Sequence, residues 1–155
     1  MPTSRPVRAI AVLSLAVPLL AGCYSMAEPS FHPGSPRQML LDINRRGVDA
    51  TALAGESACA DPGLIANAVH LRAKVASDPV ERDVWIYSFR EKGWDDTKAA
   101  VDACQAEYQA AHPGATVTRL DIPIYRVFGA DWSQELTEAL KGGLTEAANE
   151  GLPGQ

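Results

Sequence analysis

The sequence lacks the short motifs by which many enzymes are recognised. It contains no G-x-S-x-G, no H-E-x-x-H, no phosphate-binding glycine loop and no dinucleotide fingerprint. Histidine is scarce, and the three histidines, His32, His70 and His112, are too widely separated to have the spacing of metal ligands. We therefore expect no catalytic residue, no metal and no cofactor, and the protein is predicted to be non-enzymatic.

Each histidine has a simpler explanation than catalysis. His32 stands in a proline-rich stretch and is expected to be a solvated linker residue. His70 is expected at the surface or the boundary of a helix; a general base is the alternative, but no serine, cysteine or carboxylate is fixed beside it in the sequence. His112 is expected near the C-terminus of a helix, where a histidine interacts favourably with the helix dipole.

Basic residues are fewer than acidic ones. The chain has 14 Lys and Arg against 19 Asp and Glu, a net charge of −5. Because neutralising phosphates requires clustered Lys and Arg, we expect no nucleic-acid partner. Asp95, Asp96 and Asp121 could meet in space as catalytic carboxylates, but capping of a helix N-terminus is explanation enough for Asp95 and Asp96.

Long apolar runs are absent after the first twenty residues. Residues 9–20 form a run of about twelve mostly apolar residues, shorter than the roughly twenty that a membrane span requires. Arg5 and Arg8 precede this run, and a positive segment followed by a short apolar one is typical of a secretory signal.

The four residues that start at the end of this run match a specific motif. Leu20, Ala21, Gly22 and Cys23 resemble the lipobox of bacterial lipoproteins, over residues 1–23 only. In that family the cysteine thiol receives diacylglycerol, cleavage falls just before it, and the new amine can be acylated, for example with palmitate. The resemblance implies a signal peptide over residues 1–22, cleavage between Gly22 and Cys23, and lipid on Cys23. It also implies that the mature chain is held by this lipid on the extracytoplasmic face of the cell membrane. The alternatives are an ordinary signal peptide cut near Gly22 and a short buried helix.

Two cysteines remain, Cys59 and Cys104. In an oxidising compartment the simplest expectation for such a pair in a small domain is a disulfide bond. Two buried thiols or a redox-active pair are the alternatives, but the pair lacks the C-x-x-C spacing of redox motifs.

The rest of the chain has the length of one domain. Removal of residues 1–22 from 155 leaves 133. Residues 23–35 contain repeated prolines and are expected to form a lipidated tether, residues 36–150 a single α+β domain, and residues 151–155 a flexible tail.

Hydrophobic patterning predicts the elements of this domain. Leu64, Ile65, Ala68, Leu71 and Val75 form a stripe at helical spacing, ended by Asp78 and Pro79. Helices are predicted at 35–47, 49–55, 61–78, 94–112 and from 131 onward, and strands at 83–89, 115–121 and 124–128. Asp131 is expected to cap the last helix together with Gln134; Gly142 and Gly143 either break that helix or let another backbone come close. Strand, helix and strand in succession predict a β-α-β unit with parallel neighbours. The expected fold is therefore a small mixed sheet of two to three strands packed against three to four helices.

One segment has the composition of an interaction surface. Tyr125, Arg126, Phe128 and Trp132 combine aromatic rings with an arginine, as binding hot spots do. The simpler interpretation, which we favour, is that Tyr125, Phe128 and Trp132 close the core where strand meets helix. We expect a membrane-anchored lipoprotein of the cell envelope whose non-enzymatic domain binds a protein, such as an envelope protein, or another envelope component. The alternatives are a hydrolase whose site assembles only in the fold and a carrier of a small apolar ligand held beneath the aromatic strand.

Overall fold

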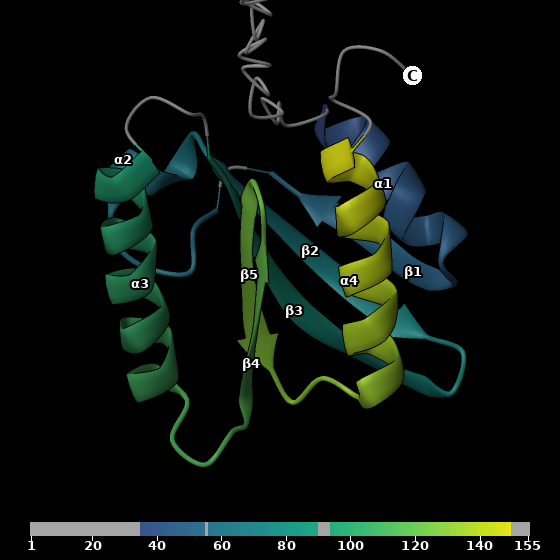
Figure 1. Ribbon diagram of the computed structural model, residues 1–155. Coiled ribbons are helices and arrows are strands. Elements are labelled where there is room, and N and C mark those ends of the chain that lie inside the picture. The colour runs from purple at the N-terminus through teal and green to yellow at the C-terminus, as the bar shows by residue number, and fades with distance from the viewer. Residues whose placement is uncertain (1–34, 55, 90–93, 150–155) are drawn as a thin grey trace, which may run out of the picture.

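Helices cover both faces of a five-stranded antiparallel sheet in the computed structural model, which describes residues 35–54, 56–89 and 94–149 (Figure 1). The elements in chain order are α1 (Pro36–Arg45), β1 (Val48–Leu53), α2 (Pro62–Ile65), β2 (Ala68–Val75), β3 (Asp78–Ser88), α3 (Trp94–Ala111), β4 (Val117–Ile122), β5 (Tyr125–Ala130) and α4 (Gln134–Asn149). The signal peptide, lipid site, tether and tail predicted from the sequence, with His32, lie outside the described residues, apart from Ser35.

The α+β class is confirmed, whereas the predicted size and type of the sheet are wrong. The strand order is β1-β2-β3-β5-β4, and each neighbouring pair is antiparallel. β3 and β4 do run parallel, but β5 lies between them because β4 and β5 form a hairpin that places Phe128 of β5 opposite Trp85 of β3. The expected β-α-β unit is therefore split by an inserted strand.

The helix predicted at 61–78 is mostly a strand. Only α2 forms, with the Asp61 side chain accepting from the N–H of Gly63 at 2.8 Å. β2 follows, because Leu71, Ala73 and Val75 also fit the alternation of a strand, and all three are buried on one face. A tight turn after Val75 lets these residues pair with β3, and this pairing stabilises the strand over the helix that the stripe predicted. Asp78 therefore begins β3 instead of ending a helix.

The helical turn predicted at 49–55 is likewise a strand, β1, which forms an edge of the sheet and pairs with β2. The expectation that residues 83–89 lie inside a sheet is confirmed, since β3 is the central strand of the five.

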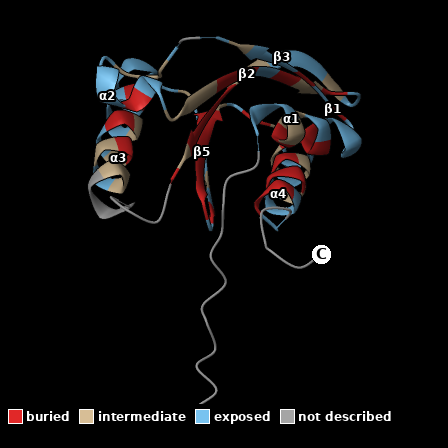
Figure 2. Ribbon diagram, turned by 90° about the horizontal axis from the view of Figure 1, so that it is seen from above, coloured by how far each residue is buried: buried red, intermediate tan, exposed pale blue. Residues whose placement is uncertain are grey.

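The two faces of the sheet carry separate hydrophobic cores. α1 and α4 cover one face, where Ile43, Leu71 and Leu140 are fully buried. α3 covers the other face, where Val101 packs with Tyr87 and Phe128. Figure 2 shows α3 on one side of β5 and α1 with α4 on the other.

The two glycines of α4 have the second of their predicted roles. α4 is unbroken from Gln134 to Asn149. A Cβ atom on Gly143 would lie 2.7 Å from the Cα of Ile43, so the helix backbones of α4 and α1 touch at this point. The predicted cap of α4 is wrong: Ser133 accepts from the N–H of Leu136 at 3.2 Å, while the Asp131 carboxylate accepts from the N–H of Thr116 at 2.9 Å.

The predicted bond between Cys59 and Cys104 is present. Cys104 lies on the buried stripe of α3 and joins it to the segment before α2, where Cys59 stands. None of the helices in the described ranges combines the length and hydropathy needed to cross a membrane.

Candidate functional site

The four residues predicted as an interaction surface are all buried. Tyr125, Arg126, Phe128 and Trp132 are 2%, 5%, 0% and 9% exposed. Tyr125 and Trp132 pack in the core beneath α1 and α4, whereas Phe128 packs beneath α3. Trp132 also donates its indole N–H to the carbonyl oxygen of Asp83 at 3.0 Å. The three aromatic residues therefore pack in the core, as the favoured interpretation of the segment predicted.

Arg126 differs from its neighbours because it carries a charge into this core. Its Nη1 is paired with Asp102 of α3, and its Nε lies 2.6 Å from Oδ1 of Asp121 of β4. Arg119 of β4 contacts the same two carboxylates, with Nη1 3.0 Å from Asp102 and Nε 3.0 Å from Oδ2 of Asp121. We call these four residues the Arg–Asp cluster; it ties α3 to the hairpin of β4 and β5.

The electrostatics of the cluster favour ionised carboxylates. Burial opposes the charge of Asp121, but hydrogen bonds from Arg119 and the charge of Arg126 outweigh it and lower the pKa of Asp121 below its ordinary value. The aspartate predicted as a possible catalytic carboxylate is thus held by two arginines. The side chains of Asp95 and Asp96 lie outside the part of the chain that the structure describes.

A pocket of about 510 Å³ opens beside the cluster, within the size range of small-molecule sites. It is lined by Phe89, Lys98, Arg119, Asp121, Ile122, Pro123, Tyr125 and Arg126, and we call it the α3–hairpin pocket. Lys98 stands one helical turn before Asp102 on α3 and makes no ion pair with the described residues. One side of the pocket is therefore cationic and the other, around the β4–β5 turn, is apolar.

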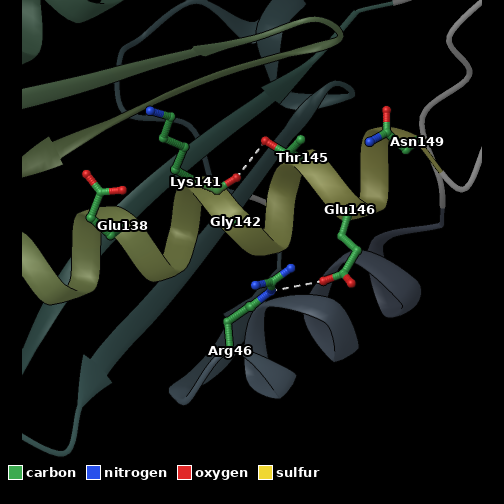
Figure 3. Close-up of a pocket in the computed structure, with 7 residues that line it drawn as sticks. All are labelled: Arg46, Glu138, Lys141, Gly142, Thr145, Glu146 and Asn149. Atoms are coloured by element: carbon green, nitrogen blue, oxygen red, sulfur yellow. Dashed lines mark hydrogen bonds and ion pairs between the residues drawn. The ribbon is translucent and has the colours of Figure 1, made fainter.

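A second hollow, of about 370 Å³, lies over α4 and the end of α1 (Figure 3). Arg46 crosses to Glu146 at 3.1 Å, and both side chains are about half exposed. Lys141 and Glu138 add one charge of each sign, so the positive and negative charges of this lining balance. Because its charges balance and its polar side chains are exposed, this hollow is the weaker candidate.

His70 is not the boundary histidine of a helix that the sequence predicted. It lies on β2, is 5% exposed, and its ring stacks on Trp85 with ring centroids 3.7 Å apart. Its Nδ1 lies 2.6 Å from Glu56 and its Nε2 lies 2.7 Å from Asp83. Both ring nitrogens are thus occupied by carboxylates, which leaves neither directed at a substrate.

His112 lies where the sequence predicted it, just after the C-terminus of α3. Its Nδ1 lies 2.7 Å from the carbonyl oxygen of Tyr108, and its ring lies against that of Tyr108. No cluster of three or more His, Cys, Asp or Glu side chains suited to a metal ion occurs within residues 35–54, 56–89 and 94–149.

Comparison with known proteins does not add to this picture: no family model, no curated protein and no solved structure matches the chain. The site therefore depends on its own geometry for an interpretation.

Three charged residues of the site, Lys98, Asp102 and Arg119, were not predicted from the sequence. Arg119 and Asp121 alternate along one face of β4, and Lys98 lies one turn from Asp102 on α3. Those spacings are visible in the sequence and would have placed each pair on one face of its element. What the spacings cannot tell is that α3 lies over the β4–β5 hairpin, so that the two pairs meet.

Proposed function

We propose that the chain is a lipid-anchored protein of the cell envelope whose folded domain binds a ligand or partner at the α3–hairpin pocket and catalyses no reaction. In this proposal Cys23 carries the lipid and the domain lies on the extracytoplasmic face of the membrane.

The observation that carries the location is the bond between Cys59 and Cys104. Disulfide bonds persist in oxidising compartments such as the envelope and are rare in the reducing cytosol. The bond also accounts for both cysteines of the domain, which leaves Cys23, in its Leu-Ala-Gly-Cys context, as the remaining thiol of the chain. Export and lipidation of Cys23 agree with both facts.

The binding role is supported by the α3–hairpin pocket. Its volume suits a small ligand or a protruding side chain of a partner, and it combines aromatic and charged residues. Arg126, at 5% exposure, is held by carboxylates from two elements, so its charge is placed by the fold instead of projecting into solvent.

A non-enzymatic role is supported by the state of the described histidines. A general base needs a nitrogen within hydrogen-bond reach of its substrate. Both nitrogens of His70 face carboxylates, Nδ1 of His112 is bound to the carbonyl of Tyr108, and neither histidine lines the α3–hairpin pocket. An entirely apolar ligand is disfavoured because Lys98, Arg119 and Arg126 all line the pocket.

Metabolic labelling with a palmitate analogue tests the anchor. The wild-type chain is expected to incorporate the label and to lose residues 1–22, as measured by the intact mass of the membrane-extracted protein. Cys23→Ala is expected to abolish labelling, whereas the double variant Cys59→Ala, Cys104→Ala is the control and is expected to retain it. A wild-type protein that keeps Met1 and gains no acyl mass would refute the proposal.

A further inference from the structure

The cations of the α3–hairpin pocket outnumber its carboxylates. Of the described residues, Lys98, Arg119 and Arg126 line the pocket with three positive charges, Asp121 lines it with one negative charge, and Asp102 adds a second through its contacts with the arginines. Both arginines contact both aspartates, while Lys98 contacts no carboxylate of the described residues. Among the described residues, this local positive excess contrasts with the net charge of −5 of the whole chain.

The arginines are also placed to recognise an oxyanion. A guanidinium presents its N–H groups as a planar fork that fits carboxylate and phosphate groups. Nη1 and Nε of Arg126 are taken by Asp102 and Asp121, and Nη2 contacts no carboxylate within the described ranges. The buried position of Arg126 lowers the entropy that binding has to remove, because the side chain is already fixed.

The remaining lining is apolar and adjoins the cationic side. Ile122, Pro123 and Tyr125 surround the β4–β5 turn, and Phe89 joins them because its N–H donates to the carbonyl of Ile124 at 2.9 Å. A ligand that spans the pocket therefore needs a charged end and an apolar end.

From this arrangement we propose that the α3–hairpin pocket binds a small molecule with a phosphate or carboxylate group at one end and a short apolar portion at the other. Lys98 and the arginines hold the oxyanion, and the rings and aliphatic side chains hold the apolar portion. The inference rests on the proposed binding role and names its ligand class; the labelling experiment above tests the anchor independently, so either can fail without the other.

Calorimetry tests the inference on the protein as isolated from cells, in phosphatidylcholine nanodiscs with empty nanodiscs as the blank; a chain that carries no lipid is titrated in buffer instead, so the result does not depend on the anchor. The probe is butyl phosphate, compared with inorganic phosphate and with butylamine. Butyl phosphate is expected to bind about tenfold more tightly than inorganic phosphate because its carbon chain is buried. Butylamine is expected not to bind. Binding of butylamine as tight as that of butyl phosphate would overturn the inference.

Two charge reversals locate the site. Arg126→Gln is unsuitable because it leaves two carboxylates without their buried partner and endangers the fold. Lys98→Glu removes no ion pair with any described residue and is expected to weaken the binding of butyl phosphate about tenfold. Lys141→Glu makes the same charge change in the hollow over α4 and is the control, with an expected change of less than about twofold. Equal weakening by both variants, or no binding of any anion, would overturn the inference.

The source of the oxyanion is distinguished by a further probe, soluble dihexanoyl phosphatidylglycerol. Tighter binding of this probe than of butyl phosphate assigns the site to a lipid headgroup. Tighter binding of butyl phosphate assigns it to a free small molecule. Both results support recognition of an oxyanion at the α3–hairpin pocket, provided that Lys98→Glu weakens the binding of both probes.

Discussion

The contact between α1 and α4 makes opposite predictions for two adjacent glycines. Both Gly142 and Gly143 are in the middle of α4, where replacement of glycine by alanine stabilises a helix by about 1 kcal/mol. A Cβ on Gly142 would meet the flexible Arg46 side chain at 3.6 Å, an ordinary contact. A Cβ on Gly143 would lie 2.7 Å from Cα and 2.9 Å from N of Ile43, which are backbone atoms of α1.

The magnitudes follow from these distances. Gly142→Ala has no clash and is expected to raise the free energy of unfolding by about 0.5 to 1 kcal/mol. Gly143→Ala requires α1 to move away from α4, and overpacking of this kind costs about 1 to 3 kcal/mol. Because the obstructing atoms are backbone, we expect the upper part of that range and a net loss of about 1 to 2 kcal/mol after the helix propensity is included.

Thermal and urea unfolding of the oxidised protein measure the difference. The two variants are expected to differ by about 1.5 to 3 kcal/mol, which corresponds to roughly 10 °C in Tm for a domain of this size. The urea m-value is expected to stay unchanged, since neither substitution alters the surface exposed on unfolding. A Gly143→Ala protein as stable as Gly142→Ala would refute the close approach of α1 and α4 at this point.

Three further predictions concern the face of the sheet that α3 covers. Replacing Cys59 and Cys104 by serine is expected to lower the free energy of unfolding by about 4 kcal/mol, the chain-entropy value for the loop that they close; a loss of less than about 1 kcal/mol in urea titrations would contradict a stabilising bond. Asp121→Asn is expected to destabilise the protein at neutral pH but not in acid. Burial opposes the charge of Asp121, but the arginines beside it lower its pKa in the folded state. Its contribution to the free energy of unfolding is therefore present above about pH 4 and is lost as the pH falls through the folded pKa. Stability curves of wild type and variant that stay parallel down to the acid limit would argue against this. Tyr108→Phe is expected to reduce the loss of stability above about pH 10. Burial and then the charge of Asp83 raise the pKa of Tyr108 in the folded state. The phenol therefore ionises first in the unfolded chain, which lowers the free energy of unfolding of the wild type as the pH rises. An identical alkaline limb in both proteins would contradict it.

The sequence predicted the elements best where a pattern fits one structure only. α3 was predicted because its buried stripe of Val101, Cys104 and Tyr108 has helical spacing and does not alternate. β2 was missed because Leu71 and Val75 are four residues apart, a separation that places both on one face of a helix and equally on one face of a strand. Residues 68–75 form a strand because they pair with β3 over most of their length. This pairing cannot be predicted from the local pattern of β2.

The same limit applies to the histidine that the sequence placed at a helix boundary. Once residues 68–75 form a strand, His70 falls on the face opposite Leu71, beside Trp85 of β3. Glu56 lies 14 positions before His70 and Asp83 lies 13 after it, so no local pattern connects the three residues. A correct strand assignment would have been needed to predict the stacked, doubly paired ring.

Arg126 was singled out from the sequence for its chemistry, and its position follows from the strand order. If β4 and β5 exchanged places, so that β5 were the edge strand of the sheet, Arg126 would lie at the edge and be open to solvent on one side. Because β5 lies between β3 and β4 and beneath α3, the guanidinium is enclosed and needs carboxylates within reach. Asp102 from α3 and Asp121 from β4 supply them, and Arg119 shares both. The pairing that makes burial of Arg126 tolerable also fixes its place in the pocket lining, so the chemistry of the site is a consequence of the inserted strand.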